Sequence, residues 1–217
     1  MMKRQTKGRK MMIIIISCIL ISIIAVVVGR ILFLITATKG KPIADYSNDQ
    51  AALIVIDVQE DIVRQYSNTK DLIHNINKSI KYAAVNNIDI IYIKQEYSNV
   101  VDLILFRGKC KANSKGASLN SQLLMKSNNI FKKLRADAFS QKKFDQYLND
   151  NMINTLYIVG ADATACVYKT SLGGVNRGYH VTILEDCVFS ANKTVLNKML
   201  LKYEKNEIGI KRINDFL

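Results

Sequence analysis

The chain has 217 residues, of which 49% are hydrophobic and 23% charged, so its length fits one globular domain with a short appendage. Its net charge of +13 is concentrated at the N-terminus. Residues 1–42 contain eight Lys and Arg residues and no Asp or Glu, which leaves 23 basic and 18 acidic residues in the rest of the chain. This mild balance, without a basic block or a known docking motif, argues against nucleic acid as a partner.

The cysteines exclude a zinc site. Cys18, Cys110, Cys166 and Cys187 form no C-x-x-C pair and no cluster with histidine. A Cys110–Cys187 disulfide would require a domain outside the cytoplasm, and a chain of this length can build a core without one, so we do not predict it. We expect no metal and no cofactor.

The N-terminal residues predict a membrane anchor. Residues 11–28 are uncharged and rich in Ile, Val and Leu, and a second apolar stretch ends at residue 37. A segment over 11–37 is long enough to span a bilayer as a helix, whereas the apolar part of a cleaved signal peptide has about 7–15 residues. A processed signal is the alternative. Five basic residues within residues 1–10 predict a cytoplasmic N-terminus and an extracytoplasmic domain.

Residues 38–50 contain the only proline, Pro42, and predict a linker, so residues 51–217 form the expected domain. Short apolar runs and helical periods then alternate along that domain. The pattern predicts an α/β fold with three layers, αβα, and a mostly parallel sheet of about six strands. The expected strands are 51–58, 88–93, 130–134, 155–161, 181–185 and 208–212. The expected helices are 69–87, one that Ser140 caps, 166–177 and 193–205.

Three polar groups fall at carboxyl ends of the predicted strands, where ligands bind in parallel sheets. They are Asp57 after the first strand, Lys133 near the third, and Cys166, which follows the fourth strand and opens a helix. A thiol at a helix N-terminus has its thiolate form favoured by the dipole, although a free cysteine is more often a small buried hydrophobe.

The two histidines, His74 and His180, lie on a helix flank and at the start of a strand. A Ser-His-Asp or Cys-His arrangement is therefore not expected. A carboxylate, an ammonium and a thiol together can pass a proton without histidine. In that case Asp57→Asn should slow alkylation of the thiol near neutral pH.

Three sequence motifs resemble those of isochorismatase-like (cysteine) hydrolases. Residues 52–59, ALIVIDVQ, look like the opening strand of that family, 133–139, KLRADAF, like its lysine motif, and 160–170, GADATACVYKT, like its nucleophile loop. Gly178-Tyr179 and Asp186 fall where the family pattern continues. The resemblance covers about residues 50–213, in the right order and spacing.

The resemblance implies a Rossmann-like isochorismatase fold in which Asp57 is the general base, Lys133 its partner and Cys166 the nucleophile. It also implies a cis peptide between Ala161 and Asp162, and an oxyanion hole formed by the N–H groups of Asp162 and Cys166. We therefore expect a metal-independent hydrolase of a small amide, ureido or carbamoyl compound that forms a thioester. We also expect a homo-oligomer, with substrate choice determined by residues 97–128 and neighbouring subunits.

Two departures from the family pattern stand out. Nicotinamidase members of the family place metal-binding histidines shortly after the second strand, but residues 92–98 here read YIKQEYS. Gly173 and Gly174 interrupt a predicted helix, at about 1 kcal/mol each in an exposed interior, and we interpret them as close packing against the sheet. Two other functions stay open: vinyl-ether hydrolysis of the isochorismatase kind, and a membrane-tethered binding module without catalysis.

Overall fold

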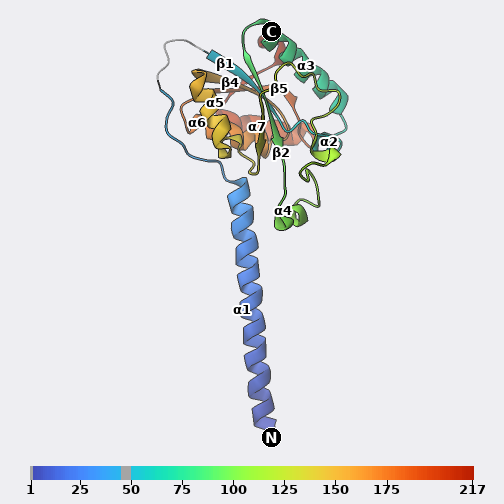
Figure 1. Ribbon diagram of the computed structural model, residues 1–217, viewed down its shortest axis with the longest axis vertical. Coiled ribbons are helices and arrows are strands. Elements are labelled where there is room, and N and C mark those ends of the chain that lie inside the picture. The colour runs from blue at the N-terminus through green and yellow to red at the C-terminus, as the bar shows by residue number, and fades with distance from the viewer. Residues whose placement is uncertain (1, 45–49) are drawn as a thin grey trace. The chain divides into compact units, whose positions relative to one another are not determined.

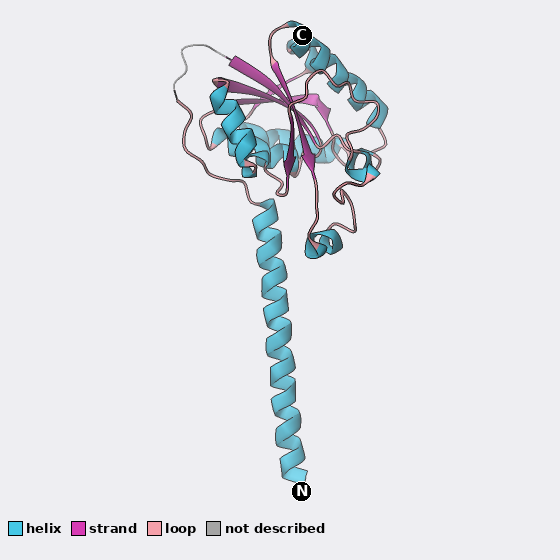
Figure 2. Cartoon of the chain, viewed as in Figure 1, coloured by secondary structure: helices cyan, strands magenta, loops and turns pink. Residues whose placement is uncertain are grey.

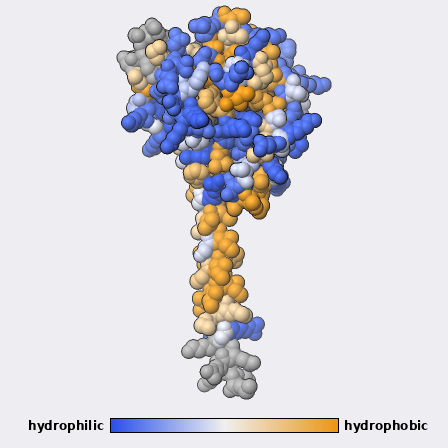
Figure 3. Space-filling view, viewed as in Figure 1, coloured by the Kyte–Doolittle hydropathy of each residue, from blue (hydrophilic) through white to orange (hydrophobic). Residues whose placement is uncertain are grey.

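The computed structural model describes residues 2–44 and 50–217. Contacts divide the chain into two units, residues 1–35 and residues 36–217. The first is the single helix α1, Met2–Ile35. Within it, Gly8–Ile35 contains an 18-residue window with a mean hydropathy of 3.3, and the helix is long and apolar enough to cross a membrane by length and composition. Figure 3 shows the apolar surface of this helix.

The second unit is an α/β domain with a six-stranded sheet in the order β3-β2-β1-β4-β5-β6, and all five strand pairs are parallel. Its strands are β1 Gln50–Ile56, β2 Asp89–Gln95, β3 Ile130–Lys133, β4 Ile153–Gly160, β5 His180–Val188 and β6 Gly209–Lys211. Its helices are α2 Glu60–Val63, α3 Thr69–Val85, α4 Val100–Leu105, α5 Lys142–Asp150, α6 Cys166–Val175 and α7 Lys193–Glu204, with 3-10 turns η1 Lys115–Ala117, η2 Ala138–Ser140 and η3 Ile213–Asp215.

Side chains of β1 alternate between two cores because successive residues of a strand point to opposite faces. Ala52, Ile54 and Ile56 pack with α5, α6 and α7, whereas Leu53 and Val55 pack with α3 and η3. Figures 1 and 2 show the helices on the two sides of the sheet. The predicted three-layer fold is confirmed, and the sheet is parallel throughout.

Several predicted details differ from the structure. Ser140 does not cap α5; its hydroxyl donates to the carbonyl of Asp137 and closes η2, and Gln141 caps the helix instead. The second strand runs two residues further than predicted and therefore includes Gln95. Gly174 does pack against the sheet, since a Cβ there would meet Val181 at 2.8 Å.

Much of the predicted linker is attached to the domain. The N–H and hydroxyl of Thr38 both donate to the buried carboxylate of Asp137 at 2.6 Å, and Arg177 donates to the Thr38 hydroxyl at 3.1 Å. A Cβ on Gly173 would meet that same carboxylate at 2.6 Å, so this glycine makes room for Asp137 rather than for the sheet. Residues 36–44 thus belong to the compact unit, and residues 45–49 of the predicted linker lie outside the described residues.

Candidate active site

The candidate site lies where the chain direction reverses across the sheet. Strands β1 and β4 are neighbours at the centre, and the chain then proceeds outward from each in opposite directions. Such a switch point opens a crevice at the carboxyl ends of the two strands, which is where open α/β sheets bind ligands. Asp57 directly follows β1, and Cys166 follows β4 after a five-residue loop.

Asp57 is fully buried and has a φ of 51°, a left-handed conformation that turns the chain sharply out of β1. Its N–H still donates to the carbonyl of Ile93 at 2.9 Å, which ties the turn to the neighbouring strand. One carboxylate oxygen, Oδ2, lies 2.7 Å from the ammonium of Lys133. Apart from this ion pair, neither carboxylate oxygen has a hydrogen-bond partner among the described residues. The carboxylate is therefore available to accept a proton.

Lys133 ends the edge strand β3, and its side chain is completely buried. Its ammonium has three acceptors for its three N–H bonds: Asp57 Oδ2 at 2.7 Å, Gln95 Oε1 at 2.6 Å and Cys166 Sγ at 3.3 Å. Burial alone would lower the pKa of Lys133, but the charge of Asp57 and the contact with Cys166 raise it above its usual range. The lysine is therefore charged at neutral pH and joins the acid to the thiol.

Cys166 is the first residue of α6, and the residue as a whole is only partly buried. Burial of the sulfur raises the pKa of Cys166 well above that of a free cysteine; Lys133 opposes this shift and Asp57 adds to it. The thiol is therefore protonated at rest. The helix N-terminus alone predicts a thiolate, whereas desolvation of the sulfur and the neighbouring carboxylate shift the pKa of Cys166 in the opposite direction.

The loop between β4 and Cys166 is tightly constrained. Gly160 has a φ of +114°, and a Cβ there would lie 2.0 Å from the carbonyl oxygen of Ile56, so only glycine fits. The peptide between Ala161 and Asp162 is cis, which is the bond that the family resemblance singled out. Asp162 accepts hydrogen bonds from the Thr164 N–H at 2.8 Å and the Tyr66 hydroxyl at 3.0 Å.

The N–H groups of Asp162 and Cys166 donate to no acceptor among the described residues. Two unpaired N–H groups that flank a thiol could hold a developing oxyanion. The structure thus leaves both predicted donors available, at the start of α6 and in the loop that precedes it.

Two buried glutamines complete the site, and the sequence analysis did not identify them. Gln95 accepts from Lys133, while its amide nitrogen donates to the carbonyls of Lys133 at 3.1 Å and Leu134 at 2.5 Å. Gln59 accepts from the Gln95 N–H at 2.7 Å and donates to the Gln95 carbonyl at 2.9 Å. A glutamine at or just after the end of a mostly apolar strand, as in residues 52–59 and 89–95, is the signal that could have revealed them.

The described residues contain no group of three or more His, Cys, Asp or Glu side chains that could hold a metal ion. Glu96 lies in the stretch 92–98, where nicotinamidase members of the family carry histidines, and its carboxylate pairs with Lys94 at 2.6 Å and Lys132 at 3.0 Å. All four cysteines are free, so Cys110 and Cys187 are not joined.

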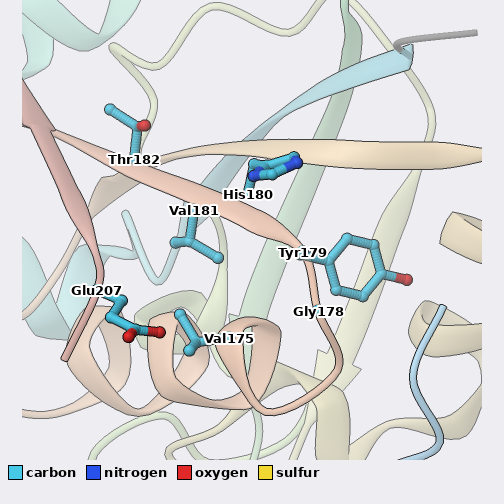
Figure 4. Close-up of a pocket in the computed structure, with 7 residues that line it drawn as sticks. All are labelled: Val175, Gly178, Tyr179, His180, Val181, Thr182 and Glu207. Carbon is cyan, nitrogen blue, oxygen red and sulfur yellow. The ribbon is translucent and has the colours of Figure 1, made fainter. Parts of the chain in front are cut away.

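His180 lines a cavity of about 410 Å³ at the amino end of β5, together with Tyr179 and Glu207 (Figure 4). Because β5 runs parallel to β4, this cavity lies at the amino ends of the strands, whereas Cys166 lies at their carboxyl ends. It contains none of the three candidate catalytic residues, and we assign it no role. His74 lies on the exposed side of α3.

These observations define a class: a parallel α/β domain with a carboxylate, an ammonium and a thiol in contact at its switch point. Comparison with known proteins identifies the family. The model of the isochorismatase domain matches residues 51–207, so the chain belongs to the isochorismatase family of hydrolases. A curated relative, isochorismatase family protein 2A of Dictyostelium discoideum, is 22% identical over 168 residues, which are 75% of this chain and 78% of that protein.

Solved structures share the fold. A cysteine hydrolase from Pseudomonas syringae pv. phaseolicola is 18% identical with a TM-score of 0.71, covering 82% of this chain and 96% of that one. A pyrazinamidase of Pyrococcus horikoshii, solved in complex with zinc, is 21% identical with a TM-score of 0.68, covering 75% of this chain and 99% of that one. At these identities the likeness establishes the fold alone.

Proposed function

We propose that this chain is a metal-independent cysteine hydrolase that cleaves a small C–N compound, an amide, ureide or carbamoyl derivative, through a thioester on Cys166. The observation that carries the proposal is the position of the Lys133 ammonium, 2.7 Å from Asp57 and 3.3 Å from the Cys166 sulfur. These contacts bring a base, a cation and a nucleophile together without histidine.

The chemistry follows from the protonated resting thiol. As Sγ attacks the substrate carbonyl carbon, the thiol proton moves to Asp57, and the carbonyl oxygen becomes an oxyanion held by the N–H groups of Asp162 and Cys166. When the C–N bond breaks, Asp57 returns the proton to the leaving nitrogen, which departs as ammonia or an amine and leaves a thioester. Water then attacks the thioester, Asp57 takes its proton, and the thiol recovers a proton as the acid is released.

Lys133 keeps the charge of the site balanced throughout. Its ammonium offsets the carboxylate at rest and can stabilise sulfur when the proton has moved to Asp57. Because three acceptors fix it, Lys133 needs no rearrangement between these states, and the glutamine pair Gln59–Gln95 holds it in that position.

Trapping the thioester tests this function. After brief mixing with a panel of small amides and carbamoyl compounds, intact-mass spectrometry should show the acyl mass on the wild-type chain, and peptide mapping should place it on Cys166. The adduct should form equally in EDTA. Cys166→Ala should give none, and Cys187→Ala, which removes a buried thiol outside the site, should behave as wild type.

Turnover that persists in Cys166→Ala, without an adduct in the wild-type chain, would instead favour vinyl-ether hydrolysis, in which the thiol is less central. Neither turnover nor an adduct with any substrate would favour a non-catalytic binding module.

We further propose that α1 holds the chain to a membrane, with the N-terminus in the cytoplasm and the domain outside. The 28-residue span Gly8–Ile35, at about 1.5 Å per residue, exceeds a hydrocarbon core of about 30 Å. The five basic residues of the first ten positions lie before or at its start, and residues 11–28 are uncharged. The support is one helix of suitable length and composition.

Alkaline carbonate washing tests the anchor. The full chain should remain in the membrane pellet, whereas a chain that begins at Thr36 should be found in the supernatant. Thr36 is the appropriate start because residues 36–44 bond to the domain. Release of the full chain would refute the anchor, and protection of the domain from protease added to intact cells would refute the orientation.

A further inference from the structure

Helix α4 exposes an unusual run of aliphatic side chains. Val100, Val101 and Ile104 are 70%, 41% and 73% exposed within a helix of six residues. The other large hydrophobic residues exposed in the described part of the domain are spaced singly along the sequence. Figure 3 shows apolar surface at the end of the domain where Figure 1 places α4.

Helix α4 is fixed to the domain by apolar packing and by an N-cap hydrogen bond. Leu103 and Phe106 pack on a small core of Tyr97, Cys110 and Ala117, and the ring of Phe106 stacks on Tyr97 with centroids 4.4 Å apart. The side chain of Asn99 caps the helix by accepting from the Val101 N–H at 2.8 Å. The helix and the residue that follows it therefore bury Leu103 and Phe106 against this core. The apolar side chains on the other side of the helix are exposed.

A basic rim follows this exposed set. Residues 97–128 contain a single acidic residue, Asp102, and it is fully buried. Arg107, Lys111 and Lys115 are exposed, and Lys109 bonds to Gln65 at 3.0 Å. The surface formed by residues 99–115, which we call the α4 surface, thus combines exposed aliphatic groups with positive charge alone.

We propose that the α4 surface docks on an anionic membrane, with Val100, Val101 and Ile104 among the acyl chains and Arg107, Lys111 and Lys115 at the phosphates. Aliphatic side chains beside Lys and Arg are the combination that interfacial segments use to bind acidic lipid. A second copy of the chain fits less well, because two such surfaces would bring like charges together. The contact can be weak, since α1 in its proposed role keeps the domain at high local concentration near lipid.

Docking would place the candidate active site at the lipid surface. Leu134, which follows Lys133 in the chain, packs on the same small core of Tyr97, Cys110 and Ala117 as Phe106 does. The α4 surface is therefore packed against the segment that carries Lys133. The proposal itself does not depend on the proposed hydrolase chemistry.

The chain contains no tryptophan, so one introduced tryptophan reports on its own surroundings. The full chain would carry Ile104→Trp in proteoliposomes of phosphatidylcholine alone or mixed with phosphatidylglycerol, some with brominated acyl chains. Val85→Trp is the matched control, because Val85 is 81% exposed at the end of α3. We expect brominated anionic vesicles to shift the Ile104→Trp emission to shorter wavelength and quench most of it, and to leave Val85→Trp unchanged.

Neutral vesicles, 1 M salt, or combined Arg107→Gln, Lys111→Gln and Lys115→Gln should remove most of that quenching, because each weakens attraction to anionic lipid. Equal quenching at Val85 would overturn the proposal, as would no quenching at either position. A shift that depends on protein density, without bromine quenching, would assign the surface to a second copy and overturn it too.

Discussion

Asp57→Asn is expected to slow turnover by about 10²–10⁴-fold, the usual contribution of a general base, and at the same time to speed alkylation of Cys166. The substitution keeps the shape of the side chain but removes the group that accepts the thiol proton. It also removes a negative charge that helps to raise the pKa of Cys166, while the Lys133 ammonium, which lowers that pKa, stays 3.3 Å from the sulfur.

Faster alkylation follows from the lower pKa of Cys166 that we expect in Asp57→Asn. A lower pKa gives a larger thiolate fraction at a given pH, and the thiolate is the form that reacts with iodoacetamide. In the wild-type chain the rate should still be rising above pH 8.5, the pKa of a free cysteine, and in Asp57→Asn the same profile should move to lower pH. Peptide mapping must resolve Cys166, because Cys18 is exposed and free.

Two results would contradict this account. Slower alkylation in Asp57→Asn, as the sequence alone suggested, would mean that the carboxylate promotes the thiolate before substrate binds. Unchanged turnover would remove Asp57 from the mechanism. Cys187→Ala serves as a control for reagent access, because that thiol is buried outside the site and burial raises its pKa.

The sequence predicted those parts of the molecule that depend on regular patterns. Alternation of apolar runs and helical periods identifies the parallel sheet, and the carboxyl ends of its strands locate Asp57, Lys133 and Cys166 in one crevice. Contacts between distant segments have no such periodicity. The bond from Thr38 to Asp137 joins residues 99 positions apart, so residues 38–44 resembled a linker in the sequence.

The direction in which the pKa of Cys166 is shifted could not be predicted from the sequence for a related reason. Sequence position shows that the residue opens a helix, and the helix dipole favours a thiolate. It does not show how completely the sulfur is surrounded, or that the Asp57 carboxylate faces it, and these two effects decide the direction of the shift. The side chains of Gln59 and Gln95 donate to backbone carbonyls of segments that are distant in the sequence. Folding alone brings these segments together, so the sequence did not show the role of the two glutamines.

The second large effect concerns stability. Lys133→Met is expected to destabilise the domain by about 3–5 kcal/mol, because it leaves the Asp57 carboxylate buried without a countercharge. Methionine nearly keeps the length and volume of lysine, so loss of packing contributes little. For a domain of this size the change corresponds to a fall in melting temperature of roughly 6–20 °C, measured by thermal unfolding with the full chain in one detergent.

The double variant Asp57→Asn/Lys133→Met separates charge from packing. With both charges gone, no buried ion is left unpaired, and the double variant should recover most of the lost stability, since neutral replacement of a buried ion pair is often tolerated. Lowering the pH should also help Lys133→Met alone, because protonation neutralises the lone carboxylate. A double variant as unstable as Lys133→Met would show that the lysine stabilises the site through Gln95 and the β3 backbone rather than through its charge, and Gln95→Met should then be equally damaging.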